Sequence, residues 1–396
     1  MSVSSIVKRG MEAGSFIRKM FEEGQRLRAQ YGADNVFDFS LGNPDLMPPP
    51  EFRKVLLEEA AREAPLIHCY MPNAGYPATR EALAGHYREW LDLPFQAENI
   101  IMTSGAGGAM NVVLKSLLEP GQEVVVLAPY FVEYGYYISN HGGKMVVVGT
   151  DEEFQPRIGA IAEAIGPATR AVIINSPNNP TGAVYERPVL DALGALLAEK
   201  SKQTGNAIYL LSDEPYRELL FDGLKYASPL LSYERCICVT SNSKDLSLAG
   251  ERIGHIAIHP RCPDAALLTA AMTFCNRTLG FVNANALMQR VVGRLQGVTV
   301  DTAPYQRRRD LLCKGLSELG FQFNCPKGAF YLFPKSPMAD DVAFADFMKD
   351  YRVIVVPGSG FGGPGYFRIS FAVPDDTIVR SLEFFGQAAK KLGMKA

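Results

Sequence analysis

The amino-acid sequence predicts an α/β protein with two domains, the larger built on a mostly parallel sheet with helices on both faces. Three observations support this fold class. The chain has 396 residues, more than one hydrophobic core usually serves. Its middle part alternates short apolar runs with helical or loop segments, which is typical of a parallel sheet. Its last part returns to strands mixed with helices, which indicates a smaller second domain.

Composition excludes several classes of function. Hydrophobic residues make up 47% and charged residues 21% of the chain, as in ordinary globular proteins. The formal net charge of −2 gives no general attraction to nucleic acid or to anionic membranes. The longest apolar runs are of strand length, and the N-terminus lacks the apolar core of a secretory signal. We therefore expect a cytoplasmic protein without nucleic-acid or membrane partners.

Cysteine and histidine spacing gives no metal site. The seven cysteines show no CxxC pair, and the five histidines have no partner at ligand spacing. We expect reduced, mostly buried thiols and no bound metal.

The N-terminal part contains a helix, a strand and a turn. Apolar residues recur at helical spacing over about residues 11–31, and residues 36–40 alternate like a strand. The turn that follows contains Gly42, whose backbone either contacts a ligand or simply reverses the chain. A loop containing Tyr70, a potentially exposed tyrosine, then precedes a helix over residues 77–90.

A candidate anion site follows the next strand. Residues 99–103 form this strand, small residues from Ser104 to Gly108 come next, and an apolar helix covers residues 109–118. Free N–H groups and the helix dipole favour a bound anion there by about 0.3–2 kcal/mol. A dinucleotide site fits less well than a single phosphate, because the third glycine of that fingerprint is replaced by Met110.

Polar residues follow the apolar runs of the predicted sheet. The runs cover residues 123–128, 144–148, 170–175, 207–211, 235–240 and 255–259. The polar and aromatic residues at strand ends are Ser104, Tyr130, Phe131, Asn178, Asn179, Asp213, Tyr216, Ser241 and Lys244. Ligands of such sheets bind at the carboxyl ends of the strands, so we expect these residues to share one site.

The C-terminal part begins with a helical pattern from about residue 274 to 318, without a strong break. Strands follow at residues 329–333, 353–356 and 367–371. Arg368 lies inside the last of these, where an unpaired charge is costly. Its partner is either a ligand carboxylate or an internal Asp or Glu.

Lys244 and Arg252 together indicate pyridoxal phosphate. A lysine desolvated at a strand exit is nucleophilic enough to form a Schiff base, and an arginine fork matches phosphate oxygens. Asp213 could keep a pyridine nitrogen protonated, and Tyr216 and Asn179 could bind a phenolate oxygen. Each residue also has an ordinary structural explanation. Lys244 and Arg252 could be solvated surface residues, and Asp213 could be a helix N-cap. Tyr216 could be a packing aromatic, and Asn179 could belong to a turn.

In this order the motifs resemble the class I/II aminotransferases, the aspartate aminotransferase superfamily of PLP fold type I. The resemblance covers nearly the whole chain. The matching residues are Tyr70, Ala74-Gly75, Ser104-Gly105, Pro129 to Tyr134, Asn179 to Gly182, Asp213 to Tyr216, Ser241 to Lys244, Gly250 to Arg252 and Arg368 to Ser370.

This resemblance implies a role for each matching residue. Lys244 would form the Schiff base and move the proton, with Asp213 and Tyr216 as the other catalytic residues. The implied cofactor-binding residues are Tyr70, Ser104, Gly105, Ala106, Phe131, Asn179, Asp213, Tyr216, Ser241, Lys244 and Arg252. Phe131 would stack on the cofactor ring, with Tyr130 the weaker choice. Arg368, Asn179 and Gly42 would bind the substrate α-carboxylate.

The resemblance also implies a fold and a reaction. The large domain (46–290) would hold a seven-stranded sheet, and the small domain (291–396) would be completed by an N-terminal arm (1–45). Tyr70 would enter the site of a second subunit, which implies a homodimer. The expected reaction, part of amino-acid metabolism, is ping-pong amino transfer between an L-amino acid and a 2-oxo acid.

Other functions on this fold are weighed against amino transfer. A β-lyase on the same fold is the alternative activity. A transcription factor is disfavoured, because the first core strand begins near Val36 and leaves no room for a DNA-binding domain. A binding protein without activity is disfavoured because every cofactor position has a workable residue. Arg277 lies near a region where other members supply a cation for a distal carboxylate, and Gly107 replaces a lysine found in one subgroup.

Overall fold

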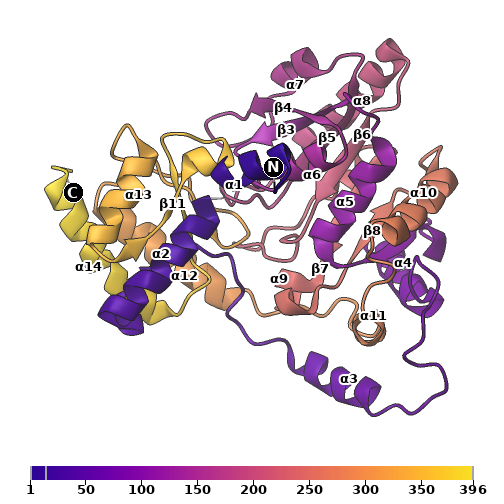
Figure 1. The fold of residues 1–396 in the computed structure, drawn as a ribbon, viewed down its shortest axis with the longest axis horizontal. Helices are drawn as coiled ribbons and strands as arrows, with labels where there is room; N and C mark the ends of the chain where they lie inside the picture. The colour runs from indigo at the N-terminus through magenta and orange to yellow at the C-terminus, as the bar shows by residue number, and fades with distance from the viewer. Residues whose placement is uncertain (1, 14–15, 395–396) are drawn as a thin grey trace.

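The computed structural model describes residues 2–13 and 16–394, and the large sheet is its central feature (Figure 1). In these residues the sheet has seven strands in the order β2-β8-β7-β6-β5-β3-β4. The strands are β2 (Ile100–Thr103), β3 (Glu123–Ala128), β4 (Lys144–Gly149), β5 (Thr169–Asn175), β6 (Tyr209–Asp213), β7 (Cys236–Ser241) and β8 (Gly254–Ile258). Strand β8 pairs antiparallel with both neighbours, and the other pairs are parallel. The predicted mostly parallel sheet is confirmed.

Helices cover both faces of this sheet. Along β3, Val125 packs into one core, whereas Val124 and Val126 pack into the other, as the period of two requires. Residues of α4 (Pro77–Leu91), α7 (Ile158–Ala164) and α8 (Arg187–Thr204) fill the first core. Residues of α5 (Gly105–Leu117), α6 (Tyr134–Asn140) and α10 (Ala265–Thr278) fill the second. Burial on both faces explains why the strands read as apolar runs.

A second, smaller α/β region combines both ends of the chain (Figure 1). Strand β1 (Phe37–Asp38) pairs in parallel with β10 (Val353–Ile354). Strands β11 (Val356–Pro357), β12 (Phe367–Ser370) and β9 (Tyr331–Leu332) form an antiparallel sheet. The helices here are α2 (Phe16–Tyr31), α12 (Ala303–Glu318), α13 (Asp341–Asp350) and α14 (Asp375–Lys391). The predicted strands 36–40 and 329–333 are thus shorter than expected.

The remaining helices are short or lie at the periphery. They are α1 (Ser5–Ala13), α3 (Pro50–Ala60), α9 (Asn242–Asp245) and α11 (Ala286–Gly293), with 3₁₀ helices η1 (Ala33–Asn35), η2 (Ala97–Asn99), η3 (Pro229–Leu231), η4 (Ala249–Glu251) and η5 (Gly358–Phe361). The Tyr136 hydroxyl of α6 donates to the Gly10 carbonyl of α1 at 3.4 Å. The predicted helix over residues 11–31 falls on the end of α1 and on α2, and its residues 14–15 lie outside the described residues.

The predicted unbroken helical run over residues 274–318 is wrong. Three helices, α10, α11 and α12, occupy this stretch, with irregular segments between them. Gly280 has φ of +91° just after α10, and Gly297 has φ of +78° between α11 and α12. Glycine adopts this left-handed backbone without strain, so each glycine lets the chain leave the helical path.

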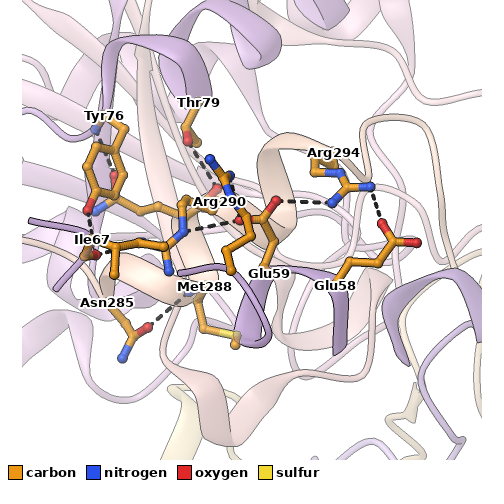
Figure 2. Close-up of polar contacts among 11 residues, drawn as sticks. Glu58, Glu59, Ile67, Tyr76, Thr79, Asn285, Met288, Arg290 and Arg294 are labelled. Atoms are coloured by element: carbon orange, nitrogen blue, oxygen red, sulfur yellow. Dashed lines mark hydrogen bonds and ion pairs between the residues drawn. The ribbon is translucent and has the colours of Figure 1, made fainter. Parts of the chain in front are cut away.

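A cluster of charged side chains joins α3 to α11 (Figure 2). The Glu59 carboxylate of α3 accepts from Arg290 Nε at 3.2 Å and from Arg294 Nη1 at 3.0 Å. Arg294 also pairs with Glu58, and Arg62 donates to Glu59 at 2.9 Å. Figure 2 shows the carboxylates of Glu58 and Glu59 facing the guanidinium groups of Arg290 and Arg294. Arg290 also donates to the Ile67 carbonyl at 3.1 Å. Each charged side chain in this cluster pairs with an oppositely charged side chain of the same chain.

Candidate active site

The carboxyl ends of β5, β6 and β7 meet at one edge of the large sheet, where a cavity of about 300 Å³ opens. Asn175 and Asp213 are register partners at the ends of β5 and β6. Most of the predicted site residues line this cavity: Gly42, Ala106, Phe131, Asn179, Asp213, Tyr216, Ser241, Lys244, Arg252 and Arg368. Residues far apart in the chain therefore form one site, as expected for this sheet type.

Asp213 is a buried carboxyl group at the end of β6. The Tyr134 hydroxyl donates to its Oδ2 at 2.5 Å, and Asn175 Nδ2 donates to its backbone oxygen at 2.9 Å. Burial raises the pKa of Asp213 to about 7, although the hydrogen bond from Tyr134 opposes this shift. In the described chain the residues after Asp213 form a turn and not a helix, so the N-cap alternative is not supported. Asp213 is placed to hold a cationic N–H group.

Lys244 reaches the same cavity from α9, the short helix after β7. Its Nζ donates to the Gly42 carbonyl at 2.6 Å and lies 5.3 Å from the centre of the Phe330 ring. Burial, together with the charges of Arg252 and Arg368, lowers the pKa of Lys244 to about 7. Within the described residues no carboxylate pairs with it. A neutral amine is therefore accessible near pH 7, which suits a nucleophile or a base.

Arg368 is a cation that the fold buries without an acidic partner. It is 1% exposed, and burial lowers its pKa. Its Nη1 donates to Asn179 Oδ1 at 3.0 Å, and its Nη2 donates to the Ser40 carbonyl. Its Nε has no hydrogen-bond partner in the described part of the chain. The internal Asp or Glu that we weighed against a ligand carboxylate is thus not found among these residues.

Aromatic rings hold Arg368 in place. The guanidinium carbon lies 4.7 Å from the ring centres of both Tyr331 and Phe361. The Tyr331 hydroxyl is 2.8 Å from the Tyr216 hydroxyl. A Cβ atom on Gly42 would lie 1.8 Å from the Tyr331 hydroxyl, so only glycine allows this approach. Gly42 thereby brings its carbonyl to Lys244 beside the arginine.

Asn179 is oriented by a second asparagine. The Asn179 backbone N–H donates to Asn175 Oδ1 at 2.7 Å, and the amide of Asn175 bonds Asp213 as described above. Asn175 therefore links the loop after β5 to the end of β6. The Asn179 side chain faces the cavity beside Arg368, so it is more than part of a turn.

The N-terminus of α5 forms an anion-binding corner of the site. Ser104 is the N-cap residue, and its hydroxyl makes no hydrogen bond to the amides of the helix. Gly105 has φ of +71°, and a Cβ there would lie 2.5 Å from Arg252 Nη2. Arg252 donates to the Ala249 carbonyl at 2.9 Å. Helix amides and a guanidinium thus lie next to one another, as a phosphate requires.

Tyr70 is one of three predicted site residues that do not line the cavity of the single chain. Its side chain is 89% exposed and is not part of the cavity wall. Ser104 and Gly105 also do not line the cavity, although Gly105 contacts Arg252, which does. Phe131 lines the cavity and Tyr130 does not.

Sequence reasoning missed Tyr331, Asn175 and Ser243 as residues of this site, and it missed the bond between Tyr134 and Asp213. Asn175 could have been found, because it is the last residue of a predicted strand. Tyr331 lies in an aromatic run of the second region, where nothing distinguishes it from core residues. Among the described residues there is no cluster of potential metal ligands, and no helix is long and apolar enough to cross a membrane.

Comparison with known proteins identifies similar sequences and structures. Residues 34–385 match the family "Aminotransferase class I and II". The aspartate/prephenate aminotransferase of Thermus thermophilus is 36% identical over 370 residues, covering 91% of this chain and 92% of that protein. The aromatic-amino-acid aminotransferase 2 of Thermococcus litoralis is 32% identical, covering 95% of this chain and 96% of that protein.

Solved structures of similar proteins share the whole fold. An amino transferase from Eubacterium rectale superimposes with a TM-score of 0.96 at 37% identity, covering 99% of both chains. The aspartate aminotransferase from Thermus thermophilus with maleate gives a TM-score of 0.87 at 31% identity, covering 98% of this chain and 99% of that chain. The likeness therefore extends over both regions of the molecule.

Proposed function

The chain belongs to the class I and II aminotransferases, a pyridoxal-phosphate-dependent family, and from this premise we propose the role of each residue in its cavity. The protein is an aminotransferase that moves an amino group between an amino acid and a 2-oxo acid. One observation carries the assignment of residues. Lys244, Asp213 and Arg368 come from three distant segments, and each faces the same cavity without a neutralising ion pair in the described chain.

The residues around the cavity fit pyridoxal phosphate. The open corner made by Gly105 and Arg252 suits its phosphate group, and the buried Asp213 suits its protonated ring nitrogen. Bound there, the cofactor supplies an electron sink for the bonds at the substrate α-carbon. The residues that would hold it are Ser104, Gly105, Ala106, Phe131, Asn179, Asp213, Tyr216, Ser241, Lys244 and Arg252, with Tyr70 of a second copy.

Asp213 acts by holding charge. A carboxylate stabilises a proton on the cofactor ring, and that bound cation restores the ionised form which burial otherwise disfavours. Tyr134 donates to Asp213 Oδ2 and Asn175 bonds its backbone, so the carboxyl group keeps one position. Tyr216 and Asn179 present a hydroxyl and an amide toward the same cavity. They would donate to the phenolate oxygen of the cofactor.

Lys244 moves the proton. Its amine, with a pKa near 7 in the ligand-free chain, can be neutral at Nζ and remove a proton from the substrate α-carbon. The same Nζ then returns the proton to complete the transfer. Two substrates use the site in turn, which gives ping-pong kinetics. The Gly42 carbonyl holds Nζ at 2.6 Å, so Lys244 is positioned before substrate enters.

Arg368 binds the α-carboxylate of the substrate, together with Asn179 and the backbone of Gly42. A guanidinium fork is well matched to a carboxylate, and Arg368 retains an unsatisfied Nε–H. The two rings that contact it restrict its rotation. An amino acid thus enters with its carboxylate fixed and its α-carbon directed toward Lys244.

The assembly and the cellular setting belong to the same proposal. The protein works as a homodimer, which is supported by the 89% exposure of Tyr70 and by the exposed Leu66 in the same loop. Seven free cysteines support a reducing, cytoplasmic compartment, where the enzyme serves amino-acid biosynthesis. The domain division is 1–45 for the arm, 46–290 for the large domain and 291–396 for the small domain. The pairing of β1 with β10 supports the arm's place in the small domain.

The test follows the cofactor absorbance of the purified, pyridoxal-phosphate-loaded protein while single L-amino acids are added. We expect a productive amino acid to shift the absorbance, release its 2-oxo acid, and leave a form that a different 2-oxo acid restores. Asp213→Asn is expected to retain cofactor but to lose most of this exchange. Exchange at the wild-type rate by Asp213→Asn would contradict the assigned role. Release of ammonia and pyruvate from a β-substituted amino acid would instead indicate a lyase.

A further inference from the structure

Two cysteines outside the cavity lie close together. Cys313 is on α12, and Cys325 follows twelve positions later, in the segment between α12 and β9. Their Sγ atoms are 3.5 Å apart, within contact distance of two thiols. Cys325 is exposed and Cys313 is partly buried. Neither takes part in the aminotransferase mechanism described above.

The other five cysteines differ from this pair. Cys236, Cys238, Cys262 and Cys275 are buried in the large domain, where burial keeps thiols inert. Cys69 is exposed, in the loop that contains Tyr70. Cys325 is therefore accessible to a small reagent. It also has a second sulfur, that of Cys313, within contact distance.

The hydrogen bond within the pair favours a thiolate on Cys325. The hydrogen bond from Cys313 lowers the pKa of Cys325, burial opposes this, and the guanidinium of Arg309 adds to the lowering. The same hydrogen bond, followed by burial, raises the pKa of Cys313. Asp310 and Asp222 oppose the thiolate, but both carboxylates are bound to Arg309. A thiolate is the attacking species in exchange with a disulfide.

We propose that Cys313 and Cys325 form a reversible intramolecular disulfide by exchange with a small-molecule disulfide such as oxidised glutathione. Cys325 thiolate attacks one sulfur of the reagent, breaks its S–S bond and releases one thiolate. The Cys313 thiol then loses its proton to solvent and attacks Cys325 Sγ, releasing the second thiolate. The two cysteines lose two electrons in total, and the reagent becomes two thiols. Excess thiol reverses both steps.

The disulfide would constrain a segment that leads into the active site. Beyond Cys325, the Pro326 carbonyl accepts from Arg309 at 3.3 Å. The backbone N–H groups of Lys327 and Gly328 donate to the Gly182 carbonyl at 3.0 and 3.1 Å. Three positions further, Tyr331 contacts Gly42 and Arg368. A bond from Cys325 to α12 would therefore tether the segment that leads to Tyr331, a residue of the cavity wall.

The experiment uses the full-length, cofactor-loaded protein incubated with oxidised glutathione. Free thiols are counted before and after, and the oxidised protein is alkylated, digested and examined by mass spectrometry. We expect the loss of two thiols, a peptide pair joined through Cys313 and Cys325, no retained glutathione, and full reversal by excess reduced glutathione. Cys313→Ser is expected to stop at one glutathione on Cys325, because the resolving thiol is missing.

Matched variants keep the result interpretable. Cys69→Ser, which changes the other exposed thiol, is expected to form the same disulfide as the wild type. Circular dichroism of Cys313→Ser and Cys325→Ala checks that each variant is folded, and the latter is expected to give no disulfide. A stable glutathione adduct on wild-type Cys325, a disulfide that uses Cys69, or two thiols that remain free would each overturn the proposal.

Discussion

The α3–α11 cluster and the active-site cavity both gather charged side chains, but only the first neutralises them with its own residues. In the cluster Glu58 and Glu59 pair with the guanidinium groups that surround them (Figure 2). In the cavity three cations, Lys244, Arg252 and Arg368, face a single carboxyl group, Asp213. None of these four side chains forms an ion pair within the part of the chain that the structure describes.

This difference separates a structural use of charge from a functional one. Burying a charge without a partner costs stability, so an unpaired buried cation is retained where a ligand supplies the missing anion. For the buried Arg368, a substrate carboxylate is an anion of that kind. The paired cluster needs no ligand, and its role is to tie α3 to α11.

The largest expected effect comes from Lys244→Ala. Removing the amine deletes the group that carries the proton, so we expect turnover to fall by about 10²–10⁴-fold. Pyridoxal phosphate should still bind through the other side chains. Steady-state kinetics and cofactor content after gel filtration check both statements. The control Lys54→Ala removes an exposed lysine of α3 and should change neither value.

Asn179→Asp would give Arg368 an internal carboxylate and so remove the difference between the cavity and the α3–α11 cluster. Nη1 already lies 3.0 Å from Asn179 Oδ1, so the aspartate would pair with it without rearrangement. We expect substrate binding to weaken by about 2–3 kcal/mol, because the new charge repels the incoming carboxylate. Kinetics with a single amino acid measure this loss. A kcat/KM equal to that of the wild type would show that Arg368 does not receive the substrate carboxylate.

Glu59→Gln tests whether the paired charges of the α3–α11 cluster stabilise the fold. Removing the shared carboxylate charge should lower the free energy of unfolding by about 1–3 kcal/mol, as measured by urea denaturation. Burial alone would raise the pKa of Glu59, but hydrogen bonds from Arg62 and Arg294 outweigh it and hold the pKa below its ordinary value. The stabilisation is therefore present above the unfolded pKa and lost as pH falls through the folded one. Wild type and variant should converge at low pH, and a constant gap would contradict this account.

A further expected effect is a pH dependence of stability in the cofactor-free protein. Lys244 has a folded pKa near 7, below its unfolded value. Burying its charged form therefore destabilises the folded protein most below pH 7. The cost is relieved as pH rises from about 7 toward the unfolded pKa, by at most about 1.4 kcal/mol per pH unit. Urea unfolding of the wild type and of Lys244→Met between pH 7 and 9 should therefore converge. Parallel stability curves would show that Lys244 is not desolvated.

Much of the cavity could be predicted because its residues are tied to strand ends. Asp213, Ser241 and Lys244 each follow an apolar run, and parallel strands place such residues at one edge. The small residues from Ser104 to Gly108, between a strand and a helix, likewise predicted an anion site at the start of α5. These inferences depend on local patterns, which the sequence displays directly.

Contacts between distant segments could not be predicted in the same way. The bond from Tyr134 to Asp213 spans 79 positions, and that between Tyr216 and Tyr331 spans 115. Nothing in the local pattern of either tyrosine distinguishes a polar role from packing. The breaks after α10 and α11 were missed for another reason, because Gly280 and Gly297 were passed over within an apolar helical pattern.

The most direct test of this contrast is Arg368→Met, measured beside Arg290→Met for both kcat/KM and the urea midpoint of unfolding. We expect Arg368→Met to lose about 2–5 kcal/mol of transition-state binding while its unfolding free energy stays within about 1 kcal/mol of the wild type. Arg290→Met should show the reverse, with lower stability and an unchanged kcat/KM. An Arg368→Met enzyme that unfolds more easily but keeps its kcat/KM would contradict the account, because Arg368 would then be a structural charge.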